Sequence, residues 1–200
     1  FSNLSIIVVI MFTKKNKYFL LIENIKDINL ENIKIRNKFL IIYRNHKKVD
    51  DLSGLLEFRR KCRLKAIKFY IANNKRLAVR LNSDGLYLSS FNKNLDSLSY
   101  KKLNCEIIGS AHNFKEIFLK KKQGCSFVLL SKLFIVNYAK NEPYLGTLRF
   151  NNISRMFKRI IPLGGISLEN LNSLKNVHGE GLAILTEVKK KPAKVFSRLF

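Results

Sequence analysis

Short runs of β-branched and aromatic residues alternate along the chain with longer stretches in which apolar residues recur every three or four positions. The short runs are typical of buried strands and the longer stretches of amphipathic helices, so the alternation predicts repeated βα units and a parallel sheet. The predicted strands are Tyr18–Ile22, Phe39–Tyr43, Ala66–Ile71, Gly85–Leu88, Glu106–Gly109, Phe127–Leu130, Ile160–Leu163 and Gly181–Leu185.

Helices are expected between these strands, most clearly over Asp50–Cys62, Phe114–Gln123 and Leu168–Val177. The last helix is opened by Ser167 with Asn170 three positions later, which is an imperfect capping box. Eight strands in alternation with helices predict an α/β fold, namely a small single-domain (β/α)₈ barrel of the TIM type with an abbreviated first unit. An open doubly wound sheet is the alternative if fewer strands form.

The length of 200 residues suits one domain, and a hydrophobic fraction of 46% is enough to bury one core. We expect the barrel over residues 11–200, with Met11 as the true start. Residues 1–10 are expected to be an upstream extension or a disordered tail, because their apolar run is too short to span a bilayer and lacks the features of a signal peptide. The rest of the sequence offers no membrane-spanning stretch, and three cysteines do not suggest a disulfide framework, so we expect a cytoplasmic protein without a membrane partner.

Lys and Arg number 38 against 14 Asp and Glu, which gives a formal net charge of +24. This excess favours anionic partners such as phosphorylated small molecules or nucleic acid. The basic runs Arg59–Lys61, Lys120–Lys122 and Lys189–Lys191 could bind nucleic acid without sequence preference, but no recognition motif accompanies them. We expect these runs to be solvated helix faces and expect no specific nucleic-acid partner, while a homo-oligomer stays open.

In a barrel of this type, ligands bind at the loops that follow the strands, and a phosphate site often lies after the seventh and eighth. Gly164 and Gly165 follow the seventh predicted strand, where backbone without side chains can approach an anion at the start of a helix. Leu185 and Thr186 stand at the end of the eighth. We predict that these four residues bind a phosphate group, with an ordinary tight turn as the alternative explanation of the glycine pair.

Four segments also resemble one enzyme family. The sequences of Ile160–Asn170 (IIPLGGISLEN) and His178–Thr186 (HGEGLAILT) resemble the segments xPVxAIGGITPEN and GADGVAVVS of thiamine phosphate synthases and the related thiazole tautomerases. Ser83–Leu88 (SDGLYL) stands where the family has ADGVHL, and Ile107–Asn113 (IIGSAHN) stands for IIGxSxHN. The resemblance extends from about Lys17 to Val188, and the order and spacing of the segments support it.

The resemblance implies an activity in thiamine biosynthesis. The family transfers a hydroxymethylpyrimidine unit from its diphosphate to a thiazole phosphate and releases pyrophosphate, with Mg²⁺ at the leaving group. As the pyrimidine becomes carbocation-like, cations must gather around the leaving oxygens while the thiazole phosphate is held separately. Phosphorylated small molecules are therefore the expected substrates.

The resemblance also assigns site residues. The family motif QLREK corresponds to Ile42–His46, which keeps the arginine as Arg44 and places Lys47 one position beyond the family lysine. We expect Arg44 to hold the diphosphate, with help from Lys47 or Lys140. Ser110 is implied as a substrate-binding residue, and Arg44 and Ser110 are the expected catalytic residues.

The acidic metal ligands of the family are replaced in this sequence. Their positions align with Asn73 and Asn92, and neutral amides would hold the hard Mg²⁺ ion only weakly. Asn73 is also expected to bind substrate. A catalytically degenerate phosphate-binding barrel is therefore the main alternative function. Tautomerase activity is not expected, because Lys132 stands near the position of the tautomerase histidine.

The histidines and cysteines show no metal-ligand spacing, so no zinc site is expected. Ser110 and His112 lie two positions apart after the fifth strand and could suggest a nucleophile and its base. We expect their side chains to point in opposite directions instead, with His112 at a helix start, in a packing role or at the rim of the site.

Overall fold

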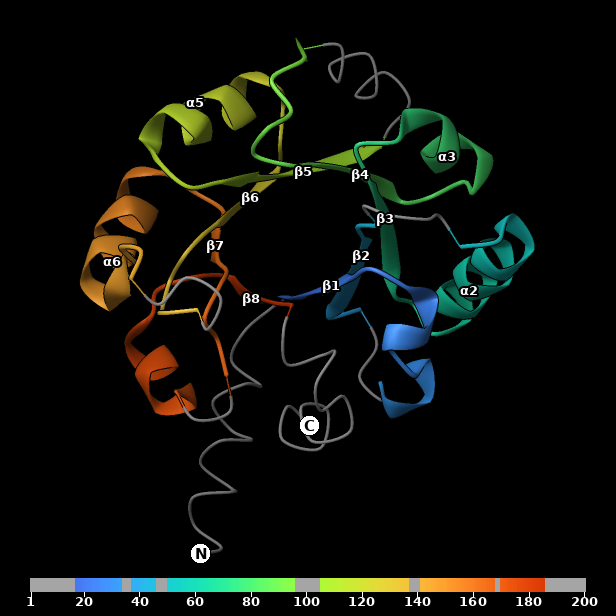
Figure 1. Ribbon diagram of the computed structural model, residues 1–200, viewed down its shortest axis with the longest axis horizontal. Helices are drawn as coiled ribbons and strands as arrows, with labels where there is room; N and C mark the ends of the chain where they lie inside the picture. The colour runs from blue at the N-terminus through green and yellow to red at the C-terminus, as the bar shows by residue number, and fades with distance from the viewer. Residues whose placement is uncertain are drawn as a thin grey trace, which may run out of the picture.

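The computed structural model describes residues 17–33, 37–45, 50–95, 105–136, 141–167 and 170–185. Within these ranges eight parallel strands surround a central axis, with the helices outside them (Figure 1). Neighbouring strands pair in the order β7-β6-β5-β4-β3-β2-β1-β8, and the circle closes through one bridge between Leu163, after β7, and Ala183 of β8. The predicted (β/α)₈ barrel is confirmed, and the open sheet is wrong.

The strand bounds follow the predicted runs closely. Ala66 and Ile67 do not belong to β3, because Ala66 has φ +55°, which breaks an extended segment. Leu163 contributes only its bridge and lies outside β7. The strands are β1 (Lys17–Ile22), β2 (Phe39–Tyr43), β3 (Lys68–Ala72), β4 (Gly85–Leu88), β5 (Glu106–Ala111), β6 (Phe127–Leu130), β7 (Ile160–Pro162) and β8 (Gly181–Ile184).

The third predicted helix is the main error in the helical assignments. The segment forms a 3₁₀ helix, η5, over Leu171–Asn176 instead of an α-helix over Leu168–Val177. Asn170 Oδ1 accepts a hydrogen bond from Ser167 N at 2.9 Å, and Asn170 Nδ2 donates to Gly165 O at 2.6 Å. Such local side-chain bonds compete with regular helix formation.

The remaining helices agree with the alternation of elements. The first unit carries two 3₁₀ turns in place of an α-helix, as its abbreviated sequence predicts. The helical elements are η1 (Ile25–Asp27), η2 (Leu30–Asn32), α2 (Leu52–Leu64), α3 (Lys75–Arg80), α5 (Phe114–Lys122) and α6 (Gly146–Met156).

Apolar side chains on the two faces of the strands form two core layers. One layer packs between the sheet and the helices, and it includes Leu55 and Phe58 of α2 and Phe150 of α6. The other layer fills the barrel interior. Strands buried on both faces need continuous apolar runs, which explains the sequence pattern. The interior layer consists of Phe19, Leu21, Leu40, Ile42, Tyr70, Tyr87, Ile108, Phe127, Leu129, Ile161, Leu163 and Ala183.

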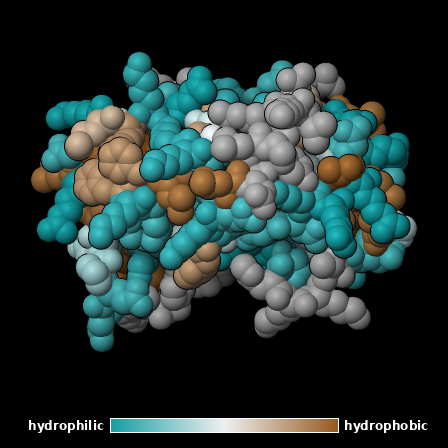
Figure 2. All heavy atoms as spheres, turned by 90° about the horizontal axis from the view of Figure 1, so that it is seen from above, coloured by the Kyte–Doolittle hydropathy of each residue, from teal (hydrophilic) through white to brown (hydrophobic). Residues whose placement is uncertain are grey.

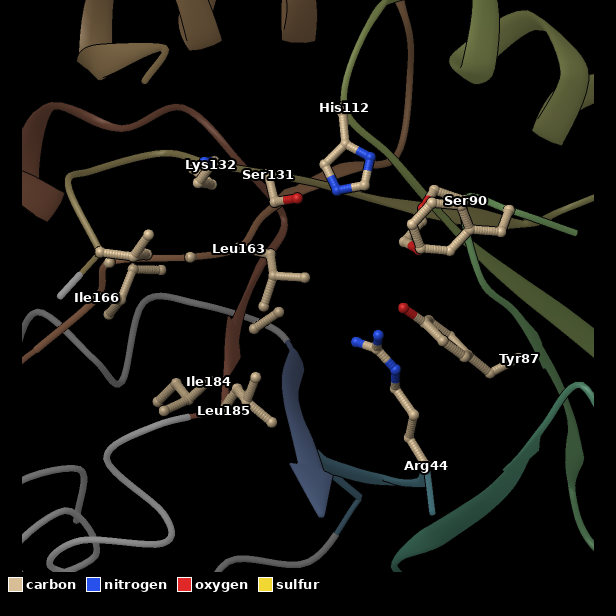
Figure 3. A pocket seen from close by; sticks show the side chains of 16 residues that line it. Arg44, Tyr87, Ser90, His112, Ser131, Lys132, Leu163, Ile166, Ile184 and Leu185 are labelled. Atoms are coloured by element: carbon tan, nitrogen blue, oxygen red, sulfur yellow. The ribbon is translucent and has the colours of Figure 1, made fainter. Parts of the chain in front are cut away.

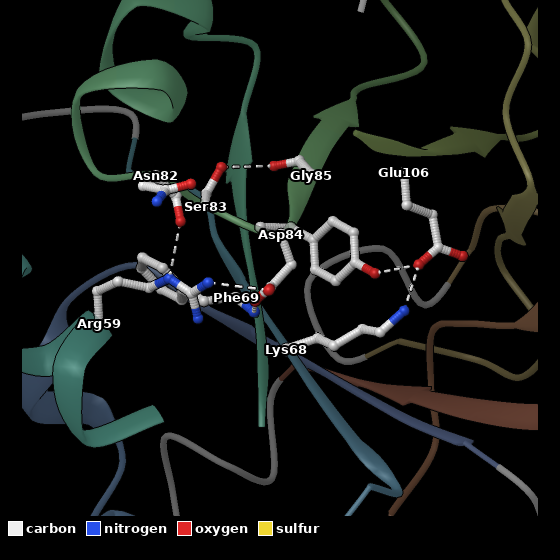
Figure 4. A network of polar contacts seen from close by, with 9 residues as sticks. Arg59, Lys68, Phe69, Asn82, Ser83, Asp84, Gly85 and Glu106 are labelled. Atoms are coloured by element: carbon white, nitrogen blue, oxygen red, sulfur yellow. Dashed lines mark hydrogen bonds and ion pairs between the residues drawn. The ribbon is translucent and has the colours of Figure 1, made fainter. Parts of the chain in front are cut away.

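A polar network ties α2 to the amino-terminal ends of β3 and β4 (Figure 4). Arg59 is only 5% exposed and donates to Asp84 Oδ1 at 2.8 Å and to Asn82 O at 3.1 Å. Asp84 Oδ2 accepts from Phe69 N at 2.7 Å. This end of the barrel lies opposite the loops that follow the strands, so the network stabilises the fold.

The same end of the barrel holds a carboxylate at the start of β5. Glu106 Oε2 accepts hydrogen bonds from Tyr70 Oη at 2.5 Å and from Lys68 Nζ at 2.9 Å, and Glu106 Oε1 accepts from Ser126 Oγ at 3.0 Å. Burial raises the pKa of Glu106, but these donors outweigh it, and the pKa lies below its usual value. Glu106 is therefore held as a carboxylate.

The basic runs are not uniformly solvated, which corrects the expectation from their sequence. Arg59 belongs to the buried network above, and Lys120 is 0% exposed. Part of the positive charge of these runs is therefore buried in the fold. The run Lys189–Lys191 and residues 1–10 lie outside the described residues.

The face shown in Figure 2 is mainly hydrophilic, with apolar side chains in small groups. On α5, Phe114 and Phe118 pack against Phe157 with ring centroids 5.9 and 5.1 Å apart. In the described part of the chain, no helix has both the length and the apolar character needed to cross a membrane.

Candidate functional site

A cavity of about 150 Å³ lies where the strands end and their following loops begin (Figure 3). The loops after β2, β4, β5, β6, β7 and β8 all contribute to its wall, as expected for a ligand site in this fold. The lining residues are Arg44, Tyr87, Ser90, Phe91, Ser110, His112, Ser131, Lys132, Val136, Leu163, Gly164, Gly165, Ile166, Ala183, Ile184 and Leu185.

The glycine pair after β7 forms one side of the cavity. Gly164 has φ +92° and Gly165 has φ +69°, both in the left-handed region that glycine adopts without strain. A Cβ on Gly165 would lie 2.4 Å from Phe134 O, so the loop after β6 passes directly against it. The fold itself therefore requires this glycine, and both glycines also line the cavity.

Arg44 directly follows β2 and enters the cavity from the side opposite His112 in the view of Figure 3. Its backbone N donates to Ile22 O at 2.7 Å, which anchors the residue to β1. Its guanidinium points toward the cavity centre, and its buried Nε has no hydrogen-bond partner in the part of the chain that the structure describes. A buried donor normally has a partner, so this one suits an acceptor group of a ligand in the cavity.

Tyr87 points into the same space from β4, and sequence reasoning missed it. The side chain is fully buried, and its hydroxyl, like Arg44 Nε, makes no hydrogen bond among the described residues, although Ser110 lies beside it. Burial raises the pKa of Tyr87, so the hydroxyl stays protonated and can donate. The available signal was its place in SDGLYL, where the family has a histidine. Two unpartnered donors at one cavity suit an anion.

Ser110 and His112 both line the cavity, so the expectation that they point in opposite directions is wrong. Side chains two positions apart on a strand share a face, and Ser110 belongs to β5 while His112 follows it. Glu116 Oε2 accepts from His112 N at 2.8 Å and lies 3.1 Å from His112 Nδ1. Asn113 caps α5 by accepting from Glu116 N, which fixes this histidine at the cavity rim.

Three further polar or charged lining residues were not predicted as site residues. Ser90 follows β4, and Ser131 and Lys132 follow β6. Lys132 forms an ion pair with Glu142. Their position directly after predicted strands was the signal that could have identified them.

The structure brings Asn73 and Asn92 together outside the residues that line the cavity. Asn92 Nδ2 donates to Asn73 Oδ1 at 3.2 Å, and Ser89 N donates to the same oxygen at 3.1 Å. Asn92 Oδ1 accepts from Asn94 N at 3.0 Å. Both amide oxygens thus already accept hydrogen bonds within the chain, and the group that Asn92 turns toward Asn73 is its Nδ2 donor.

These residues do not fit a Mg²⁺ ion, which prefers charged oxygen ligands. No group of three or more His, Cys, Asp or Glu side chains able to hold a metal occurs among the residues that the structure describes. Three predicted substrate-binding residues, Lys47, Lys140 and Thr186, lie outside those residues and stay predictions.

Comparisons with known proteins agree with the fold and the motifs. The sequence profile of the thiamine monophosphate synthase family matches residues 7–188. The chain is 27% identical over 163 residues to the thiamine-phosphate synthase of Flavobacterium johnsoniae, which covers 74% of this chain and 76% of that protein. It is 30% identical over 136 residues to the thiamine-phosphate synthase of Prochlorococcus marinus subsp. pastoris, covering 65% of this chain and 37% of the relative.

Solved structures show the same architecture. Thiamine phosphate pyrophosphorylase from Pyrococcus furiosus has a TM-score of 0.72 at 16% identity, with 93% of this chain and 94% of that chain covered. A 3-keto-L-gulonate-6-phosphate decarboxylase from Vibrio cholerae has a TM-score of 0.63 at 10% identity, with 92% and 97% covered. Because the family profile spans most of the chain and its motifs meet at one cavity, this protein belongs to the thiamine monophosphate synthase family.

Proposed function

We propose that this protein is a transferase of the thiamine-phosphate synthase type, which joins hydroxymethylpyrimidine diphosphate to thiazole phosphate and releases pyrophosphate. The observation that carries the proposal is a pair of buried donors, Arg44 Nε and Tyr87 Oη, which have no hydrogen-bond partner among the described residues and lie at a cavity that Gly164 and Gly165 also line. The two side chains thus offer a charged donor and a hydroxyl donor, and the glycine loop offers backbone that a ligand can approach closely.

In this reaction the bond between the pyrimidine methylene carbon and the diphosphate oxygen breaks, and its electron pair leaves with the diphosphate. The Arg44 guanidinium stabilises the negative charge that develops on those oxygens, and the Tyr87 hydroxyl donates a hydrogen bond beside it. The thiazole nitrogen then forms the new bond to the methylene carbon, while the loop at Gly165 holds the thiazole phosphate. Ser110 is buried and lines the same cavity, where it would be a further substrate contact.

A second candidate, a phosphate-binding barrel without turnover, is favoured by two observations. The Asn73–Asn92 pair does not fit a metal ion, and the cavity of about 150 Å³ is smaller than the roughly 300–1,000 Å³ typical of small-molecule sites. A single phosphorylated ligand would be compatible with both observations, because it needs neither a metal ion nor room for a second substrate.

Purified protein incubated with both substrates, with MgCl₂ or with EDTA, distinguishes the two candidates. Formation of thiamine phosphate supports the transferase, and Arg44→Gln is expected to abolish it. The control variant Arg76→Gln removes the same charge from the exposed surface of α3 and should retain activity. Binding of the single substrates by calorimetry without product would instead support the binding protein.

A further inference from the structure

One lysine of α5, Lys120, is buried between the helix and the sheet, where a glycine of β5 leaves space for its side chain. Lys120 is 0% exposed, although its neighbours Lys121 and Lys122 lie nearer the surface. A Cβ on Gly109 of β5 would lie 2.7 Å from Lys120 Cδ, so a side chain at that position would displace the lysine stem. Gly109 therefore makes room for a long side chain to pass between helix and sheet.

The Lys120 ammonium ends among oxygen atoms of the loop after β4. Its Nζ donates to Ser89 O at 2.7 Å, to Asn92 O at 2.7 Å and to Gln123 Oε1 at 2.9 Å. An ammonium has three donors, and all three are used. No carboxylate in the described ranges forms an ion pair with it. A buried cation is costly, and here polar acceptors replace the water and the counter-ion.

Gln123, at the end of the same helix, completes the contact with this loop. Its Nε2 donates to Asn92 O at 3.0 Å and to Asn94 O at 2.8 Å. From the other side, Asn73 Oδ1 accepts from Ser89 N and from Asn92 Nδ2. The loop Ser89–Asn94 is thus fixed by side chains on both of its flanks.

This loop supplies part of the cavity wall. Ser90 and Phe91 line the cavity together with Arg44 and Tyr87. We propose that Lys120 is a positioning residue, whose buried ammonium acts with Gln123 as a protein-supplied cation that holds the loop after β4 and sets Ser90 and Phe91 in the wall of the site. The proposal does not depend on which reaction the site performs, and it requires no metal ion.

Lys120→Met tests this role, because methionine keeps an unbranched stem and removes every donor. The matched control is Lys122→Met, the same change on the exposed side of the helix. Hydrogen exchange should become at least about tenfold faster at the amides of Ser89, Asn92 and Asn94, while β2 amides and the control keep their rates. Gln123→Met provides a second variant if Lys120→Met does not fold, and it should accelerate exchange at the same amides.

Affinity for inorganic pyrophosphate in EDTA, measured by calorimetry, gives the second readout. It should fall about tenfold in Lys120→Met and stay unchanged in Lys122→Met. The proposal is overturned if loop exchange matches the control, or if exchange accelerates equally across the barrel in both test variants. If the wild-type protein does not bind pyrophosphate, the proposed phosphate site is wrong, and loop exchange alone decides the role of Lys120.

Discussion

Replacing both amides of the Asn73–Asn92 pair with carboxylates tests whether this corner of the barrel can be made to hold a divalent cation. The wild-type pair is joined by a hydrogen bond of 3.2 Å, and in the double variant Asn73→Asp, Asn92→Asp two negative oxygens would face each other instead. Coulomb repulsion at 3.2 Å is about 1 kcal/mol in bulk water and about 5 kcal/mol at an effective dielectric of 20. Because Asn73 is exposed, we expect a loss of about 1–2 kcal/mol.

Magnesium should reverse this loss, since the added carboxylates are the charged oxygen ligands it prefers. With a Kd of about 1 mM and about 10 mM free ion, binding contributes about 1.4 kcal/mol. In a chain of this size 1 kcal/mol shifts Tm by about 2–4 °C. We therefore expect Tm to fall by about 2–8 °C in EDTA and to recover by about 3–6 °C in MgCl₂, while the wild-type Tm stays nearly constant.

Differential scanning calorimetry measures both effects, with KCl at equal ionic strength as the control for screening. The single variant Asn73→Asp should lose little stability, because its carboxylate still accepts from Ser89 N and Asn92 Nδ2. A double variant that is as stable as the wild type and insensitive to Mg²⁺ would refute the adjacency of the two side chains. An equal response in the wild type would refute the conclusion that the amides do not fit the ion.

Three other changes test the site and its support. Arg44→Lys should weaken pyrophosphate binding more than monophosphate binding in calorimetry, because lysine cannot make paired contacts; equal losses would contradict separate subsites. Gly165→Val should abolish monophosphate binding and lower Tm, since its Cβ would lie 2.4 Å from Phe134 O. Unchanged monophosphate affinity in a folded variant would contradict the assignment of the monophosphate site to this loop. Glu106→Gln should make the decline of Tm below about pH 5 shallower. The depressed pKa of Glu106 contributes stability that is lost as the pH falls through this pKa, and glutamine has no such contribution to lose. An unchanged profile of Tm against pH would show that the pKa of Glu106 does not differ between the folded and unfolded states.

The strands could be predicted from the sequence because barrel strands are buried on both faces and read as uninterrupted apolar runs. Their ends were less predictable where one residue decides the boundary. Ala66 is as apolar as the strand that follows it, and only its positive φ separates it from β3. The helix expected over Leu168–Val177 failed for a related reason, since the side chain of Asn170 bonds to nearby backbone.

Residues that line the cavity could be predicted where a loop position or a family motif marked them, as for Arg44 and Gly165. Tyr87 was missed because a tyrosine in a buried strand looks like a core residue, and the direction of its hydroxyl depends on how the barrel closes. Lys120 was missed because three successive lysines look alike in sequence. The helical period places it on the face of Ile117, three positions earlier, and both side chains are fully buried.

The closure of the barrel has a consequence for the resistance of the protein to local opening and proteolysis. β8 pairs along its length with β1, but within the described ranges its β-pairing with the β7 side consists of one bridge, between Leu163 and Ala183. The loops on both sides of this seam, at Gly165 and Leu185, line the cavity. A ligand that touched both loops would hold the two edges of the seam together, so its dissociation would have to precede any peeling of β8. Occupancy of the site would then set the lifetime of the closed barrel against proteases as well as its chemistry.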